Sequence, residues 1–155
     1  MNVPYIFDPG QQCARMTGDE LLEGLTGSAI LICNDYEYEL IQQKTGLTEA
    51  DILGRTGMLI VTLGEHGCRI ATTSSHVEVP AVPPHRIEDP TGVGDAFRGG
   101  FLKGLAHGVE PLVCARLGSV AATYALEHLG GMSHAYTWKE FQTRYEEHFG
   151  PLTLG

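Results

Sequence analysis

The sequence has few basic residues and no cluster of them. Lys and Arg number 10 against 19 Asp and Glu, which gives a formal net charge of −9. Proteins that bind DNA or RNA gain much of their affinity from cations placed against phosphates. We therefore expect no nucleic acid partner. A small anionic ligand remains compatible with this charge, because a few backbone N–H groups are enough to hold a phosphate.

Long hydrophobic runs are also missing. The longest apolar runs, residues 29–33 and 58–61, are far shorter than the roughly 20 residues that a membrane-spanning helix needs. The first residues contain no cationic stretch followed by an apolar run, which a secretory signal would require. We expect a cytoplasmic protein without a membrane partner.

The four cysteines and seven histidines lack the spacing of metal ligands. Cys13, Cys33, Cys68 and Cys114 form no CxxC pair, and no HExxH pattern occurs. Neither a zinc site nor a dense disulfide framework fits this pattern. It predicts reduced and mostly buried thiols.

Short apolar segments alternate with segments of helical pattern. The predicted strands are 3–7, 29–33, 58–62, 68–72 and 76–79, and the predicted helices are 17–25, 34–44, 48–53, 96–106, 111–129 and 137–148. Continuous apolar strands are typical of a sheet covered on both faces. The sequence therefore predicts an α/β domain with a largely parallel sheet.

The segment from Gly92 to Asp95, which reads Gly-Val-Gly-Asp before a predicted helix, has the features of an anion site. Glycines let the backbone turn sharply and approach a ligand closely. The first N–H groups of a helix lack internal partners, and the helix dipole adds positive charge there. By spacing alone, an ordinary turn with an acidic residue in the first turn of a helix is the more common explanation of such a segment.

A longer match separates these alternatives. The segment from Asp89 to Phe97, DPTGVGDAF, closely resembles the D-[TP]-T-G-[AV]-G-D-[AST]-F signature of the ribokinase, or phosphofructokinase-B, family of carbohydrate and nucleoside kinases. The segment from Asn34 to Glu37 is similar to its N-x-x-E motif, and the segment from Val61 to Gly67 is similar to its V-T-x-G-x-x-G nucleotide turn. Residues 8–12 resemble a strand-end segment of the family.

The resemblance implies a Rossmann-like ribokinase fold, with a mostly parallel sheet flanked by helices. It covers essentially the whole chain, but only the C-terminal half of a typical member. Residues 1–155 would be the C-terminal ATP-binding and catalytic portion, without the N-terminal half and its lid. The chain is then either a fragment or a natural short protein. A lone half would expose a sheet edge, so we expect self-association or poor solubility. The partner would be a second copy in a homodimer or the missing N-terminal half.

The resemblance assigns the chemistry to the glycine-rich segment. Asp95 would take the proton of the substrate hydroxyl as it attacks the γ-phosphate of ATP. The backbone N–H groups of Gly92, Val93, Gly94 and Asp95 would form an anion hole for the transferring phosphate. Asp89, with residues 130–133, would form a K⁺ site in those members that a monovalent cation activates.

The remaining roles leave alternatives open. Asn34 and Glu37 would contact phosphates and organise Mg²⁺ through water, yet Asn at an N-cap with Glu three residues later is itself a capping arrangement. Arg98 would contact a phosphate or only pack on its helix. The residues that would line the path of ATP are Thr62, Leu63, Gly64 and Gly67, although they also suit an ordinary turn. The residues on the substrate side would be Gln11 and Gln12, although they also suit a solvated loop.

The resemblance implies an ATP-dependent kinase that phosphorylates a hydroxyl group of a small molecule. Pro90, Arg98, residues 8–12 and the run from Asn34 to Glu37 look like bacterial adenosine kinases, so adenosine is the first candidate substrate. The alternatives are a sugar of the ribose or fructose type, a nucleotide-binding fragment without activity of its own, and a non-catalytic interaction protein.

Overall fold

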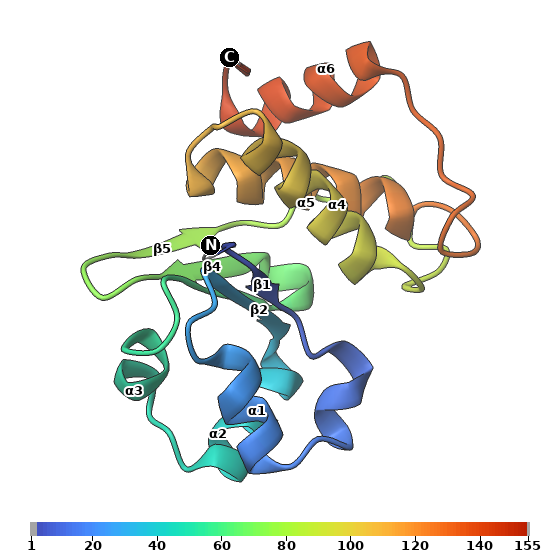
Figure 1. Cartoon of the computed structure of the whole chain (residues 1–155). Helices are drawn as coiled ribbons and strands as arrows, with labels where there is room; N and C mark the ends of the chain where they lie inside the picture. Colours follow the sequence, from blue (N-terminus) through green and yellow to red (C-terminus); the bar gives the residue numbers. More distant parts are fainter. Residues whose placement is uncertain (1–2, 155) are drawn as a thin grey trace. The chain divides into compact units, whose positions relative to one another are not determined.

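The computed structural model describes residues 3–154, and the chain divides into two compact units (Figure 1). The N-terminal unit consists of residues 1–64 and 68–78, and the C-terminal unit consists of residues 65–67 and 79–155.

A five-stranded sheet has the strand order β1-β2-β3-β4-β5. The strands are β1 (Ile6–Phe7), β2 (Ile30–Asn34), β3 (Leu59–Thr62), β4 (Cys68–Ala71) and β5 (His76–Val79). β1, β2 and β3 run parallel, and β4 is antiparallel to β3. The predicted α/β class with a mostly parallel sheet is confirmed.

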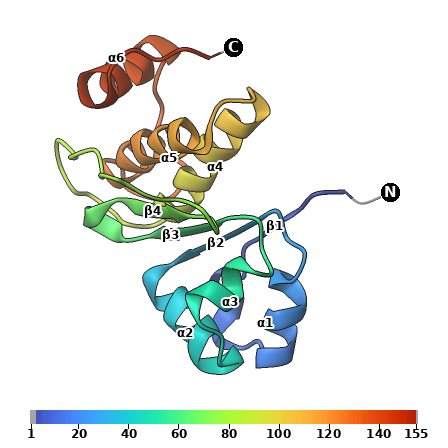
Figure 2. The ribbon, with the colours of Figure 1, turned by 90° about the vertical axis from the view of Figure 1, so that its left-hand side faces the viewer.

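Three helices cover one face of this sheet in the N-terminal unit (Figure 2). They are α1 (Gly18–Leu25), α2 (Asp35–Thr45) and α3 (Glu49–Leu53). Leu21, Leu25 and Ile41 on these helices are fully buried against Leu31 and Leu59 of the strands. Each such side chain contributes roughly 1.5 to 3 kcal/mol of hydrophobic stabilisation.

The C-terminal unit is built from α4 (Val93–Ala106), α5 (Pro111–Leu126) and α6 (Trp138–Phe149). Glycines allow α4 and α5 to approach closely. A Cβ atom on Gly100 would lie 2.6 Å from the Leu117 carbonyl oxygen, and one on Gly118 would lie 2.8 Å from the Phe97 carbonyl oxygen. On its other side α5 packs against Phe141 of α6.

Several local predictions differ from the structure. The helix predicted over 111–129 ends at Leu126. The first strand is limited to two residues of the predicted 3–7. Residues 10–14 form a 3-10 helix, η1, that the sequence did not predict. Helix α4 begins at Val93 rather than at residue 96, because Gly92 takes the left-handed conformation (φ 78°) that ends the preceding turn and starts the helix there.

The four cysteines are free and buried, as predicted. Within residues 3–154, no helix is long and apolar enough to cross a membrane.

Candidate functional site

The N-terminus of α4 carries the glycine-rich segment. Gly92 is its N-cap, and no side chain of the described residues makes a cap hydrogen bond there. A Cβ atom at Gly92 would lie 2.7 Å from the Gly131 Cα atom, so both the space and the positive φ require glycine. The Val93 N–H donates to the Pro90 carbonyl at 3.3 Å. The N–H groups in the first turn of an α-helix have no acceptor inside the helix, and in α4 these include the N–H groups of Gly94 and Asp95. This end of α4 is therefore suited to an anion.

Asp95 is the third residue of α4, and its side chain is 87% exposed. Arg98, one turn further along, places Nη1 3.5 Å from Asp95 Oδ1. The helix therefore presents a carboxylate and a guanidinium together beside uncapped N–H groups. Arg98 pairs with Asp95, and its contact with a phosphate stays a prediction.

Asp89 closes the loop before α4. Its Oδ1 accepts from the Thr91 N–H at 2.8 Å, and its Oδ2 accepts from the Gly130 N–H at 2.9 Å. These hydrogen bonds, above all those from Thr91, hold the pKa of Asp89 below its usual value. Asp89 thus joins the signature loop to the segment after α5. Its part in a K⁺ site stays a prediction.

Asn34 and Glu37 form a complete capping box at the start of α2. Asn34 Oδ1 accepts from the Glu37 N–H at 2.7 Å, and Glu37 Oε2 accepts from the Asn34 N–H at 2.9 Å. Asn34 also pairs in register with Thr62, so the parallel strands β2 and β3 end side by side at these two residues. The capping alternative is therefore present. It uses the side-chain oxygen of Asn34 and leaves its amide nitrogen available for a phosphate.

The predicted nucleotide turn follows β3. Thr62 is the last residue of the strand, and Leu63 is half-buried against the core of the N-terminal unit. Gly64 and Gly67 have φ values of 58° and 89°, so both positions favour glycine. The turn is formed as predicted, and its contact with ATP stays a prediction.

Gln11 and Gln12 lie on η1 with exposed side chains. The segment around them is held by Lys44 of α2, whose Nζ donates to the carbonyl oxygens of Cys13 at 2.9 Å, Ala14 at 2.8 Å and Met16 at 2.7 Å. Sequence reasoning missed Lys44, because it lies about 30 residues away and no local pattern links it to this turn.

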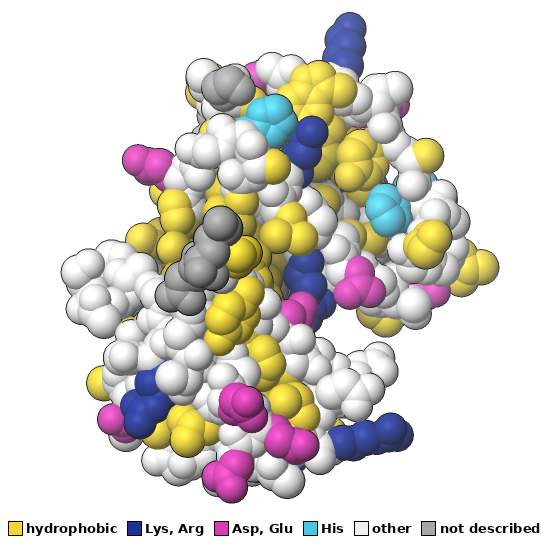
Figure 3. All heavy atoms as spheres, viewed as in Figure 1, with side chains coloured by type: hydrophobic (Ala, Val, Ile, Leu, Met, Phe, Trp, Pro, Cys, Tyr) yellow, Lys and Arg dark blue, Asp and Glu magenta, His cyan; other side chains and the backbone are white. Residues whose placement is uncertain are grey.

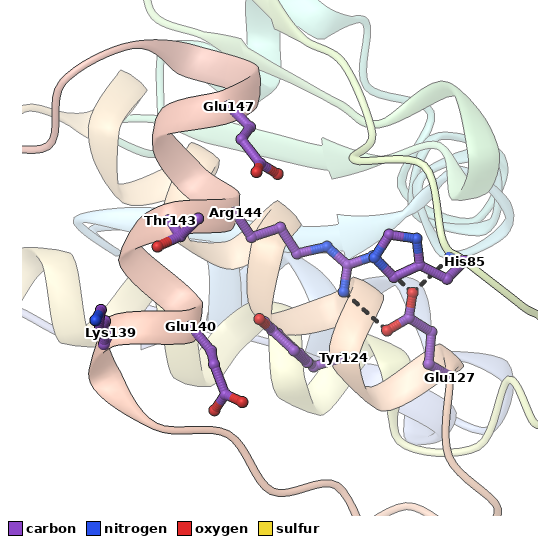
Figure 4. A pocket seen from close by; sticks show the side chains of 8 residues that line it. All are labelled: His85, Tyr124, Glu127, Lys139, Glu140, Thr143, Arg144 and Glu147. Carbon is purple, nitrogen blue, oxygen red and sulfur yellow. Dashed lines mark hydrogen bonds and ion pairs between the residues drawn. The ribbon is translucent and has the colours of Figure 1, made fainter.

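Charged side chains outside these segments are arranged as follows. Among the described residues, no group of three or more His, Cys, Asp and Glu is arranged to hold a metal ion. On the face drawn in Figure 3, Lys and Arg side chains lie singly rather than in a patch. A depression of about 340 Å³ in the C-terminal unit has Tyr124, Glu127 and Arg144 in its lining, and none of the predicted site residues lines it (Figure 4).

Known proteins resemble the chain over almost all of its length. In the solved structure of a nucleoside kinase of Burkholderia thailandensis in complex with ADP-inosine, 40% of matched residues are identical and the TM-score is 0.94. The match covers 99% of this chain and 48% of that one. A nucleoside kinase of Methanocaldococcus jannaschii is 32% identical over 142 residues, which are 92% of this chain and 47% of the relative.

A cytidine kinase of Thermococcus kodakarensis is 42% identical over 78 residues, which are 49% of this chain and 28% of the relative. The chain spans about half the length of the curated nucleoside kinases that it matches. Residues 2–138 match the family described as pfkB family carbohydrate kinase. The chain has the ribokinase fold and belongs to the pfkB family of carbohydrate kinases.

Proposed function

We propose that this chain supplies the ATP-binding, phosphate-transferring part of a kinase that phosphorylates a hydroxyl group of a nucleoside. The observation that carries the proposal is the start of α4. A glycine N-cap leaves the first turn without a side-chain cap, and Asp95 stands exposed on that same turn. Family membership and the likeness to nucleoside kinases support it.

The proposed reaction needs positioning and charge stabilisation more than covalent help. The hydroxyl oxygen of the acceptor forms a bond to the γ-phosphorus, the bond from that phosphorus to the bridging oxygen breaks, and ADP leaves. Asp95 takes the hydroxyl proton as the new bond forms, and a proton transferred this late does not require a strong base. The N–H groups of the first turn of α4 stabilise the negative charge of the transferring phosphoryl group.

The proposal includes Mg²⁺ bound with few protein ligands. Among the described residues no three or more of His, Cys, Asp and Glu are arranged to hold a metal ion, so the proposed ion would keep several waters and be bound mainly through phosphates. Glu37 is the carboxylate that we assign to it, through water. Its Oε2 atom is engaged by the Asn34 N–H, and this agrees with an indirect contact. Bound Mg²⁺ would neutralise charge on the phosphates of ATP.

The acceptor that we propose is a nucleoside, with adenosine as the first candidate from the resemblance of the sequence. Several similar proteins are described as nucleoside or cytidine kinases, and one solved structure holds ADP-inosine. Others are described as inositol 3-kinases or as an uncharacterised sugar kinase. The nucleoside and cytidine kinases favour a nucleoside but not adenosine in particular. A sugar acceptor is the alternative, because the family as a whole is described by carbohydrate kinases.

A second proposal follows from the length of the match. Because the chain spans about half of its relatives, it would bind ATP but release ADP only in a homodimer or with a missing N-terminal half. Gln11 and Gln12 are the residues that we assign to the acceptor side.

The test is ADP release at fixed Mg-ATP with adenosine, inosine, ribose and fructose offered in parallel. Release that depends on a nucleoside would support the proposed function, and the preferred nucleoside would decide on adenosine. Release with ribose or fructose alone would contradict the nucleoside acceptor. ATP binding without release, at any protein concentration, would support the nucleotide-binding alternative, and absence of ATP binding would contradict both proposals.

The same assay tests the K⁺ prediction. If Asp89 and residues 130–133 hold K⁺, replacing Na⁺ by K⁺ at constant ionic strength raises turnover. Turnover that does not change with the K⁺ concentration would contradict this prediction, and it would leave the proposed role of Asp95 unchanged.

A further inference from the structure

The segment from Pro80 to Glu88, which leads to the signature loop, contains no helix or strand after β5 ends at Val79. Its backbone N–H and C=O groups therefore cannot form the hydrogen bonds of a helix or a sheet, and each needs another hydrogen-bond partner. The position of this segment matters, because it enters the loop that Asp89 closes and that ends at Gly92.

Side chains of α5 supply those partners at a spacing of four residues. Ser119 and Thr123 lie one turn apart on the same face of the helix. Ser119 Oγ donates to the Pro80 carbonyl and accepts from the Val82 N–H, both at 3.1 Å. Thr123 Oγ1 lies 2.9 Å from the carbonyl oxygens of both Val82 and Ser119, so it shares its one proton between them. Together these two hydroxyls bind the first part of the segment to α5.

Glu127, four residues beyond Thr123, continues the series at the end of α5. Its Oε1 accepts from the His85 N–H at 2.6 Å, and its backbone carbonyl accepts from Arg86 Nε at 3.1 Å. The N–H groups of Glu88 and Asp89 donate to the Leu126 carbonyl at 2.9 and 3.3 Å. The polar ladder formed by Ser119, Thr123 and Glu127 thus holds the segment as far as Arg86, and the Leu126 carbonyl holds Glu88 and the first residue of the signature, Asp89.

Arg144 of α6 completes the ladder with a buried ion pair (Figure 4). Its Nη1 and Nη2 donate to the two carboxylate oxygens of Glu127 at 2.8 and 2.6 Å, and Nη2 also donates to the Pro83 carbonyl at 3.2 Å. Both residues are only 6% exposed. Arg144 therefore fixes the Glu127 carboxylate and holds the segment itself.

A buried ion pair is a poor means of gaining stability. Well-packed apolar residues of similar size often stabilise a protein as well or better, because the two charges must be removed from water. A pair of this kind does fix one geometry, since its hydrogen bonds are directional. Glu127 contacts His85 and Arg144 contacts Pro83, so the geometry that the pair fixes is the position of this segment on α5.

We propose that Glu127 and Arg144 are positioning residues for phosphoryl transfer, holding the segment from Pro83 to Asp89 on α5 and so placing the loop that ends at Gly92. The effect on transfer rests on the proposed function, whereas the effect on the loop does not. Asp89 is held at the end of this segment, because its Oδ2 accepts from the Gly130 N–H just beyond α5. The position of the segment therefore bears on the position of the loop that begins at Asp89.

The decisive variant is the double substitution Glu127→Leu with Arg144→Met. It removes the pair without leaving an unpaired buried charge, so the Tm is expected to stay within a few degrees of wild type or to rise. Residue-resolved amide exchange of the whole chain is the main measurement. We expect the amides of His85, Glu88 and Asp89 to exchange at least about tenfold faster, because the anchor of their segment is gone.

The matched control replaces an exposed pair of α6 in the same way, Glu146→Leu with Gln142→Met. Glu146 Oε1 accepts from Gln142 Nε2 at 2.9 Å, and neither residue contacts the segment from Pro80 to Asp89 in the hydrogen bonds described above. Exchange at His85 and Asp89 should equal wild type in this control. If the Glu127/Arg144 variant also shows wild-type exchange there, the pair does not position the loop and the proposal fails.

A second variant keeps the test valid if the double variant does not fold. Arg144→Lys keeps a positive charge beside Glu127 but loses the two-pronged hydrogen bonding to its carboxylate, and it should speed exchange at His85 more than at α6. A uniform rise over the whole C-terminal unit would indicate lost stability alone and would overturn the proposal.

Turnover then tests the link to catalysis. In the assay of nucleoside-dependent ADP release, the Glu127/Arg144 variant should lose at least about tenfold in kcat with little change in the nucleoside KM, because a displaced loop lowers transition-state stabilisation rather than binding. Faster exchange with unchanged kcat would overturn the positioning role. A wild-type chain without turnover would count against the proposed function, while amide exchange would still decide whether the pair holds the loop.

Discussion

Helices α2 and α4 begin in opposite ways. At the start of α2, Asn34 and Glu37 satisfy each other's backbone N–H groups through a capping box. At the start of α4, Gly92 has no side chain, and no side-chain cap bond is made. α1, α3 and α6 repeat the closed arrangement, each with a threonine N-cap and an acidic residue three positions later.

The difference shows where the chain gives up local stability. A side-chain N-cap is worth about 1 kcal/mol, and α4 does without it although its dipole favours a negative charge at that end. α5 also lacks a side-chain cap, but Pro111 at its first position removes one of the free N–H groups. A ligand anion is the partner that the start of α4 suits. The comparison therefore predicts that removal of the exposed carboxylate at the start of α4 affects catalysis more than stability, and that removal of the threonine caps of α1, α3 and α6 does the reverse.

The largest effect is expected for Asp95→Asn. Loss of the proton acceptor should lower nucleoside-dependent turnover by a factor of about 10² to 10⁴, with ATP affinity nearly unchanged because the backbone N–H groups remain. Steady-state kinetics and ATP titration measure the two quantities. Asp19→Asn, an exposed acid in the first turn of the closed helix α1, is the control and should leave turnover intact. Normal turnover of Asp95→Asn would show that Asp95 is not the base.

Gly92→Ala is expected to come next. The added Cβ would lie 2.7 Å from Gly131 Cα at a φ of 78°, so the variant should lose about 1 to 3 kcal/mol of stability and distort the start of α4. Thermal unfolding and turnover both report it. Gly99→Ala, inside α4 with nothing within 4 Å of the new Cβ, should instead gain about 0.5 to 1 kcal/mol. Equal Tm values for both variants would contradict this account.

Asn34 separates capping from nucleotide contact. Asn34→Ala should cost about 1 kcal/mol, whereas Asn34→Ser keeps a cap and should restore most of that stability. If the amide nitrogen also contacts a phosphate, both variants bind ATP more weakly. Thr48→Ala removes the N-cap of α3 and serves as the control, with the same loss of stability and unchanged ATP affinity. Wild-type affinity in Asn34→Ser would leave Asn34 as a cap only.

The smallest effect concerns pH. Hydrogen bonds from Arg144 lower the pKa of Glu127 relative to its usual value of 4.5. A depressed pKa in the folded state means that the stabilisation is present above about pH 4.5 and is lost as the pH falls through the folded pKa. The Glu127→Leu/Arg144→Met variant should therefore lose less stability than wild type on acidification below pH 4.5. If the free energy of unfolding falls equally in the two proteins as the pH is lowered below 4.5, the ion pair does not lower the pKa of Glu127.

The fold could be predicted largely because its signals are local. Apolar runs of strand length and the capping patterns at Thr17, Asn34, Thr48 and Thr137 place most elements within a few residues of their observed bounds. The nine-residue signature likewise identified the α4 segment. The start of α4 was placed three residues too late, because a glycine N-cap gives no capping signal, and only the backbone shows its left-handed conformation.

The supporting contacts could not be predicted. Lys44 meets carbonyl groups of residues 13–16, and Arg144 meets Glu127 and Pro83, across separations of 17 to 61 residues. Such pairs depend on how helices pack, which no spacing in the sequence encodes. They are also the contacts that hold the predicted site segments in place.

The most direct test of the comparison is a titration of the ¹⁵N-labelled chain with Mg-ATP and, separately, Mg-ADP. We predict that the backbone amides of Gly92, Val93, Gly94 and Asp95 shift, and shift more with ATP than with ADP, while those of Glu20, Asp51 and Glu140 at closed helices stay unchanged. If ATP binds and the α4 amides do not respond, or respond no more than those of the closed helices, then the open start of α4 is not the phosphate site.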